Sequence, residues 1–424
     1  MKKRVLFLAM VTLAGIVSAQ EVTLDSCRHW ARENYPLVQK YGLVAQSAEY
    51  SVVNASRAWL PQVRFSAQAT WQTDAACYPD EMNAMLAAMG TEIEGIRQDQ
   101  YKLALDVQQN LWDGGRSAAE KRIAQQQAEV DRLSTDVDFH ALEGRVDDLF
   151  FGILLLEEQR SQIASRLALL EDNLRRCQVM KTNGLLMQSD VDAVEAELLT
   201  ARQQSRQTER SCEAYREMLS LLTGKPMAEA TLAMPEARLS LSPAESTPQI
   251  KMLEAMTSQT EAQESLLRSA SMPQLALFAQ GWYGYPGLNM FENMQNADWS
   301  LNAIVGIRLA WNISAYYTQK NNLDRLQNTR QQLAVQRDVA QFNRSLQLRQ
   351  MESEVARLGS TLRDDDRIVA LRQSVREAAE VKHAEGVIGT TDLLRTITDE
   401  SMAQSARTLH RIEMIKKQYE ISRL

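Results

Sequence analysis

The sequence contains few of the residues that build disulfide scaffolds or irregular chains. Among 424 residues there are 4 Cys, 9 Pro and 17 Gly, which excludes both a disulfide-rich scaffold and a low-complexity chain. The cysteines are far apart and show no CxxC or Cys/His spacing, so we expect them to stay unpaired and to bind no metal. They are Cys27, Cys77, Cys177 and Cys212.

Patterns typical of catalysis are also missing. The 4 histidines are scattered, and there is no HExxH, no GxSxG and no glycine-rich phosphate loop. The sequence therefore predicts no enzyme, no catalytic residue, no cofactor and no metal site, and nothing in it favours the alternative of a secreted hydrolase on a helical scaffold. The formal net charge of -7 speaks against nucleic acid as a partner, because phosphates repel an acidic surface.

Long apolar runs are absent beyond the N-terminus. Residues 1–19 combine a basic start, an apolar stretch and small residues before Gln20, which is the pattern of a signal peptide. No cysteine stands at that cleavage point, so we expect no lipid anchor there. The longest later apolar run, residues 149–156, is far shorter than the roughly 20 residues of a membrane helix. Any membrane crossing by the mature chain must therefore use strands.

The chain carries an internal duplication. Its pattern predicts a first repeat over residues 20–222, a connecting segment rich in Pro, Ala and Ser over 223–247, and a second repeat over 248–424. Three landmarks recur in the same order: Leu60-Pro61-Gln62 with Met272-Pro273-Gln274, Leu111-Trp112-Asp113 with Ala310-Trp311-Asn312, and Asn183-Gly184-Leu185 with Glu385-Gly386-Val387.

Each repeat contains one very long helix, because residues 116–182 and 314–385 lack proline and are rich in helix-forming residues. A helix of about 68 residues is roughly 100 Å long, more than a compact domain needs. Apolar residues in the first follow a heptad spacing typical of a coiled coil. They are Leu142, Val146, Leu149, Ile153, Leu156, Ile163, Leu167, Leu170, Leu174 and Cys177.

Shorter helices are expected on either side of each long one. They cover residues 23–57, 188–222, 248–270 and 391–424. Those of the first repeat are each about half the length of its long helix. The simplest packing therefore places each long helix antiparallel to a pair of short helices that lie end to end.

Four segments alternate apolar and polar residues with a period of two, which predicts strands with one apolar and one polar face. They are residues 63–72, 101–111, 275–285 and 299–312. A half-buried strand of a soluble sheet is the alternative for any single one. Together, their length and the aromatic residues at their ends favour a membrane sheet. Four strands cannot close a barrel and open edges are not tolerated in lipid, so several chains must combine.

These motifs resemble those of the TolC family of outer-membrane efflux proteins over nearly the whole mature chain. The matching segments are the first helix opening from Val22 to Pro36, the strand starts Pro61-Gln62 and Pro273-Gln274, the strand-to-helix exit Leu111-Trp112-Asp113-Gly114-Gly115-Arg116, and the two tip turns around Gly184 and Gly386. Two positions depart from the family pattern. The second exit, Ala310-Trp311-Asn312-Ile313, lacks the glycine pair, and Ile388 stands where some members carry a basic residue.

The resemblance implies a mainly α protein with a membrane β portion. It implies a homotrimer with a twelve-stranded β-barrel in the outer-membrane lipid of a Gram-negative bacterium, continued by a twelve-helix coiled-coil α-barrel in the periplasm. Such a protein would be the exit duct of a tripartite efflux or type I secretion system, and would passively conduct substrates delivered by a periplasmic adaptor and an inner-membrane transporter. The alternative is a periplasmic coiled-coil scaffold without a membrane barrel.

The two helix tips are the candidate contact sites. The resemblance implies that Gly184, Leu185, Gly386 and Val387 contact the periplasmic adaptor. The glycines also have a purely structural interpretation, since a left-handed glycine commonly ends a helix. Both roles require the same residues.

Asp190 and Asp392 are the candidate residues of the periplasmic aperture, again as the resemblance implies. Repeated in three chains, they would form a ring of carboxylates that attracts cations, and their repulsion would be relieved by opening or by a bound cation. The structural alternative is that both residues only start helices, where carboxylates satisfy free backbone amides.

Overall fold

The computed structural model describes residues 21–90, 93–236 and 246–424. The predicted signal peptide of residues 1–19 and part of the connecting segment lie outside the described residues. The chain divides into two units. One contains residues up to Tyr41 together with Leu133–Lys251 and Asp338–Leu424, and the other contains Gly42–Arg132 and Met252–Arg337.

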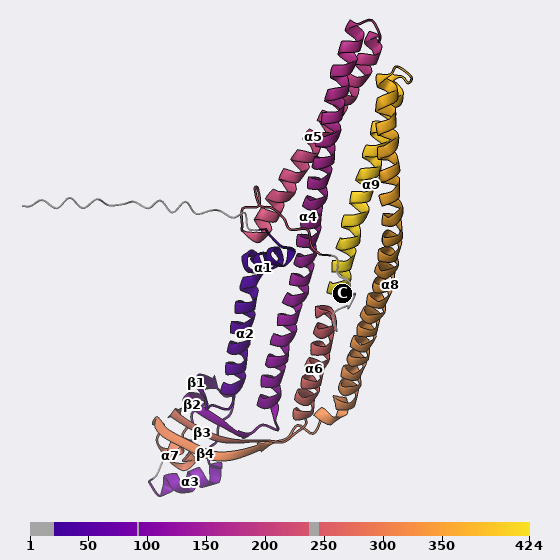
Figure 1. Ribbon diagram of the computed structural model, residues 1–424. Coiled ribbons are helices and arrows are strands. Elements are labelled where there is room, and N and C mark those ends of the chain that lie inside the picture. The colour runs from indigo at the N-terminus through magenta and orange to yellow at the C-terminus, as the bar shows by residue number, and fades with distance from the viewer. Residues whose placement is uncertain (1–20, 91–92, 237–245) are drawn as a thin grey trace, which may run out of the picture. The chain divides into compact units, whose positions relative to one another are not determined.

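The second unit contains a four-stranded antiparallel sheet in the order β1-β2-β3-β4 (Figure 1). The predicted strands are confirmed as β1 (Gln62–Trp71), β2 (Asp99–Trp112), β3 (Gln274–Tyr285) and β4 (Ser300–Ala310). Two short helices, α3 (Asp80–Ala88) and α7 (Met290–Gln295), lie in the connections between paired strands. The two repeats meet inside this sheet, because β2 of the first pairs with β3 of the second.

The register places apolar side chains on one continuous face of the sheet. Phe65 lies opposite Leu105 and Ala67 opposite Leu103, and Tyr283 lies opposite both Leu103 and Leu301. This face is open in the single chain, where Phe65 is 70% and Leu301 is 81% exposed. The alternation predicted from the sequence is therefore confirmed on this side, and the face is unusually apolar for an exposed surface.

The opposite face is less polar than predicted. Phe278 and Trp282 lie on it, and each is covered by a cation: Arg308 Cζ is 4.7 Å from the Phe278 ring centre and Lys102 Nζ is 4.5 Å from that of Trp282. Aromatic rings and cations attract each other, so these residues are compatible with a face rich in charge. The predicted polar residues Asn302 and Arg308 do lie on this face, and the structure adds two aromatic residues that the prediction did not assign to it.

Tyr285 lies opposite Tyr101 on the predicted apolar face, but unlike Tyr101 it is buried. It is buried at the end of β3, where its hydroxyl donates to the Asn293 carbonyl at 3.0 Å and accepts from the Arg97 backbone N–H at 2.9 Å. A tyrosine with an apolar ring can be buried when its hydroxyl has partners. Here they come from the two loops that join the strands.

The two long helices are confirmed as α4 (Arg116–Thr182) and α8 (Ala315–Ala384), and each contributes residues to both units. The shorter helices are α5 (Gln188–Thr223), α6 (Pro248–Ser269) and α9 (Thr390–Arg423). The heptad positions of α4 face the core, as shown by the buried side chains of Val146, Ile153, Leu170 and Cys177. Among the described residues, no helix is both long and apolar enough to span a membrane.

The single helix predicted over residues 23–57 is wrong. The structure has α1 (Leu24–Asn34) and α2 (Val38–Arg57) instead, with Tyr35 in an extended conformation. The residue before a proline avoids helical torsions, so Pro36 forces this break. The break lets Asn34 reach the end of α5, where its Nδ2 donates to the Leu221 carbonyl at 3.1 Å.

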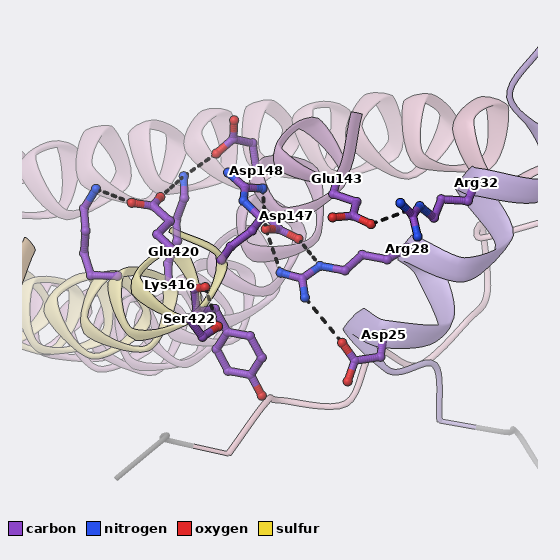
Figure 2. A network of polar contacts seen from close by, with 12 residues as sticks. Asp25, Arg28, Arg32, Glu143, Asp147, Asp148, Lys416, Glu420 and Ser422 are labelled. Carbon is purple, nitrogen blue, oxygen red and sulfur yellow. Dashed lines mark hydrogen bonds and ion pairs between the residues drawn. The ribbon is translucent and has the colours of Figure 1, made fainter. Parts of the chain in front are cut away.

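One buried carboxylate joins three segments of the first unit (Figure 2). Asp147 of α4 accepts from Arg28 of α1 at 2.7 and 2.8 Å and from Arg423 of α9 at 2.9 Å. Its side chain is only 3% exposed. Burial opposes the charged form of Arg28, but Asp147 outweighs it and raises the pKa of the guanidinium. Helices α1 and α9 are thus tied to the same point of α4.

Candidate functional site at the helix tips

The first tip joins α4 to α5 through a left-handed glycine. Gly184 has φ +75°, and its N–H donates to the Lys181 carbonyl at 2.9 Å while Leu185 N–H donates to the Met180 carbonyl at 2.9 Å. These two bonds satisfy carbonyls that the end of a helix leaves free. The turn is therefore a Schellman motif that reverses the chain within a few residues.

The second tip, between α8 and α9, repeats this geometry. Gly386 has φ +71°, its N–H donates to the His383 carbonyl at 3.0 Å, and Val387 N–H donates to the Lys382 carbonyl at 2.8 Å. The duplication found in the sequence thus extends to individual hydrogen bonds. The left-handed role of both glycines is confirmed, whereas their contact with an adaptor stays a prediction.

Apolar side chains project from both turns. Leu185 and Val387, which the resemblance selected, are exposed, and Met187 at the start of α5 is 75% exposed. The exposure of Met187 was not predicted from the sequence. A methionine in a turn before a helix is, however, far from any apolar core, and this position could have suggested it. Exposed apolar side chains on such turns give each tip a hydrophobic surface suited to contact with a protein partner.

Asp190 and Asp392 occupy equivalent positions in the first turns of α5 and α9, but they differ in surroundings. Asp190 is partly buried, and its Oδ2 accepts from the Met187 backbone N–H at 3.1 Å. The capping interpretation is therefore supported for Asp190. Asp392 is exposed, and among the described residues no backbone N–H donates to its carboxylate in this way.

A buried polar group that sequence reasoning missed lies between the tips. His383 of α8 is 5% exposed, and its Nε2 lies 3.2 Å from Oγ1 of Thr390, the first residue of α9. Burial lowers the pKa of His383, the nearby Arg176 lowers it further, and Asp190 opposes both. A single histidine on a long polar helix gives no sign in the sequence that it is buried and hydrogen-bonded to Thr390.

Thr390 also connects α9 to α4. The pKa of the buried Cys177 thiol is raised mainly by burial, and the nearby Thr390 side chain acts in the other direction. Leu394 of α9 packs into the apolar cluster formed by α4 and α5, which includes Leu170 and Val191. The two tips of the chain are therefore packed against each other rather than independent.

The comparisons with known proteins agree with this geometry. Residues 28–225 match the sequence profile described as outer membrane efflux protein. The chain is therefore similar to this family over the first of its two repeats. Among curated protein sequences, none matches the chain significantly.

Solved structures share the fold of this chain over most of its length. The outer membrane protein VceC from Vibrio cholerae is 13% identical with a TM-score of 0.69, covering 94% of this chain and 95% of that one. The outer membrane channel CmeC from Campylobacter jejuni is 13% identical with a TM-score of 0.67, covering 93% and 83%. The MtrE channel from Neisseria gonorrhoeae is 16% identical with a TM-score of 0.66, covering 94% and 88%. At these identities the likeness describes the fold.

Within the described part of the chain, no group of three or more His, Cys, Asp or Glu side chains is arranged to hold a metal ion. The thiols of Cys27, Cys177 and Cys212 are buried and free, and that of Cys77 is exposed and free.

Proposed function

We propose that this chain is an outer membrane efflux protein that forms the trimeric exit duct of a tripartite efflux or type I secretion system. Its sheets form a twelve-stranded barrel in the outer membrane, and its helices form a coiled-coil barrel in the periplasm. The observation that carries this proposal is the continuous apolar face of the sheet, exposed in the single chain. A scaffold that stays in water would gain nothing from such a face.

The edges of the sheet support assembly from several chains. Strands β1 and β4 each have one neighbour in the described sheet, and an open edge in lipid leaves backbone groups without hydrogen bonds. Because each chain contributes four antiparallel strands, β4 of one chain can pair with β1 of the next without breaking the alternation. Three chains then give the twelve strands of the proposed barrel.

Apolar stripes on α8 support the same assembly. Val339, Phe342 and Leu346 are exposed, as are Ile368, Leu371 and Val375. In both sets the spacing is three and then four residues, which is the spacing of a coiled-coil seam. We propose that helices of neighbouring chains pack on these stripes in the trimer.

The helix tips are proposed as the contact with the periplasmic adaptor. Leu185, Met187 and Val387 are exposed there, and Asp392 lies exposed beside them. The chain has no nucleotide-binding motif, so the energy for transport comes from the inner-membrane transporter and the duct is passive. The transporter then also determines the substrate.

The proposal is tested by a matched pair of variants on β4. Val305 lies opposite Ala279 on the apolar face, and the adjacent Ile304 lies opposite Gln280 on the other face. An arginine facing lipid near the membrane midplane costs about 2 to 4 kcal/mol. We therefore expect Val305→Arg to reduce the trimer recovered from outer membranes, and Ile304→Arg to affect it much less.

The wild-type measurement is the native mass and the single-channel conductance of the purified mature protein. The proposal predicts a trimer that requires detergent and conducts ions in planar bilayers. A monomer stable in plain buffer, or equal behaviour of the two arginine variants, would instead favour the periplasmic scaffold.

A further inference from the structure

Three cations and one carboxylate lie on the polar face of the sheet. They are Arg64, Lys102, Arg308 and Asp106. The register places Arg64 opposite Asp106, and Asp106 opposite Gln280. Alternate residues of a strand share a face, so Lys102 and Arg308 belong to the same face. In the described strands, the first residue of β2 aside, no charged residue lies on the apolar face.

One of the three cations is linked to the carboxylate. The side-chain carbonyl of Gln280 accepts from Lys102 Nζ at 3.1 Å, and the amide of the same side chain donates to Asp106. Gln280 thus connects the ammonium group to the carboxylate. Because these two opposite charges lie in one short network, their fields largely cancel at a distance. The charge that remains on this face is that of Arg64 and Arg308.

Both arginines are exposed and lack a carboxylate partner. Among the described residues, neither Arg64 nor Arg308 forms an ion pair. Arg308 lies over the ring of Phe278, with Cζ 4.7 Å from the ring centre, and this contact positions the guanidinium group without neutralising its charge. Guanidinium groups keep their charge in proteins. Each chain therefore presents two fixed positive charges on the polar face of its sheet.

The two arginines are close enough along the strands to form one basic zone. Through Asp106, the register aligns Arg64 with Gln280 of β3, and Arg308 lies opposite Ala276 of the same strand. The four residues between these two levels of β3 span roughly 14 Å. In about 0.01 M salt the Debye length is about 30 Å, so the fields of both groups overlap. Exposed acidic residues are found in the connections beyond the strands, so the basic zone is confined to the strands.

We propose that this basic zone makes the sheet an anion-selective segment of the duct, with Arg64 and Arg308 as the residues that determine the preference. The inference rests on the proposed function, because it requires the polar face of the sheet to line a lumen. Three chains place six guanidinium groups, two from each, around that lumen. Fixed charges of one sign concentrate mobile ions of the other sign. The solutes favoured in this segment are therefore negatively charged, such as carboxylates, sulfonates and phosphates.

The test is the reversal potential of the mature protein in planar bilayers, with KCl at about 0.01 M on one side and about 0.1 M on the other. The double variant with Arg64→Gln and Arg308→Gln should lower the ratio of chloride to potassium permeability by about twofold or more. The double variant with Arg64→Lys and Arg308→Lys keeps both charges and should retain the wild-type ratio. Asp106→Asn removes the carboxylate of the face and should raise the ratio.

Two further measurements keep the test decisive. In about 1 M salt the Debye length is about 3 Å, so the differences between the variants should become much smaller. Arg64→Gln alone replaces the double variant if the latter does not assemble, and it should lower the ratio in the same direction. A wild type that does not conduct would overturn the proposed duct and this inference together. A conducting wild type whose permeability ratio equals those of the glutamine variants and of Asp106→Asn would overturn this inference and leave the duct intact.

Discussion

At the residue scale, Gly184 and Gly386 show why the tip turns could be predicted from the sequence. A Cβ at either position would meet open space within 4 Å, so the need for glycine comes only from the positive φ. A left-handed backbone costs a residue with a side chain about 1 to 2 kcal/mol. The two glycines are therefore required by the turn itself rather than by packing.

We expect Gly184→Ala or Gly386→Ala to lower the local stability of its tip by about 1 kcal/mol. Amide hydrogen exchange of the turn residues measures this directly. Gly359 is the control, since it lies within α8 without a positive φ and with open space around it. Gly359→Ala should instead stabilise its helix by about 1 kcal/mol. Equal exchange in all three variants would show that the turns are not held by glycine.

His383 gives the tips a dependence on pH. Burial lowers its pKa, with Arg176 acting in the same direction and Asp190 against it, so the folded tip favours the neutral ring. The contribution of His383 to stability is therefore complete above the unfolded pKa of about 6.5 and is lost as the pH falls below it. We expect lower protection of the amides around Thr390 at pH 5.5 than at pH 7.5, when each exchange rate is divided by the intrinsic rate at that pH. His383→Gln, which can still bond to Thr390, should remove most of this difference, and an unchanged pH dependence in that variant would assign it to another group.

At the scale of elements, the carboxylate of Asp147 decides how α1, α4 and α9 are held together. Asp147→Asn would leave two arginines around a neutral amide, and losing one partner of a buried ion pair typically costs about 3 to 5 kcal/mol. The neighbouring Asp148 pairs with Lys416 at 2.5 Å but is 66% exposed (Figure 2). Asp148→Asn should therefore cost only about 0 to 1 kcal/mol.

Limited proteolysis of the purified protein can separate these two effects. We expect Asp147→Asn to expose cleavage sites in α1 and near the C-terminus, whereas Asp148→Asn should resemble the wild type. Similar cleavage in both variants would mean that the apolar cluster around Val146 and Phe150, and not the shared carboxylate, holds these helices.

Local sequence patterns predicted the ends of some helices correctly and missed others. The bounds of α4 and α8 agree with the prediction to within a residue or two, because absence of proline and heptad spacing are local properties. The break at Pro36 was missed although the proline was visible. What makes that break favourable is the contact of Asn34 with the end of α5, where a Cβ on Gly224 would come within 2.5 Å of Asn34 Oδ1. A contact across nearly two hundred residues leaves no periodic pattern.

At the scale of the whole molecule, the proposed trimer depends on contacts that the exposed apolar stripe of α8 makes with a neighbouring chain. Phe342 is exposed in the single chain and would be buried between chains. We expect Phe342→Glu to shift the native mass from trimer toward monomer, because a carboxylate would be buried in an apolar seam. Gln341, also exposed, lies beside it but outside the stripe, and Gln341→Glu should leave the trimer intact. A trimer that survives Phe342→Glu would place the interface on other helices.

The sequence by itself determined the elements of this protein and their repetition. Alternation, heptad spacing, proline and glycine each act over a few residues, so strands, long helices and tip turns follow from local patterns alone. Only the tertiary structure decided which elements meet. The pairing of β2 with β3, the sharing of Asp147, and the burial of His383 between hairpins depend on contacts between distant residues. Such contacts form because burial and hydrogen bonding depend on the whole fold, and no local pattern encodes them.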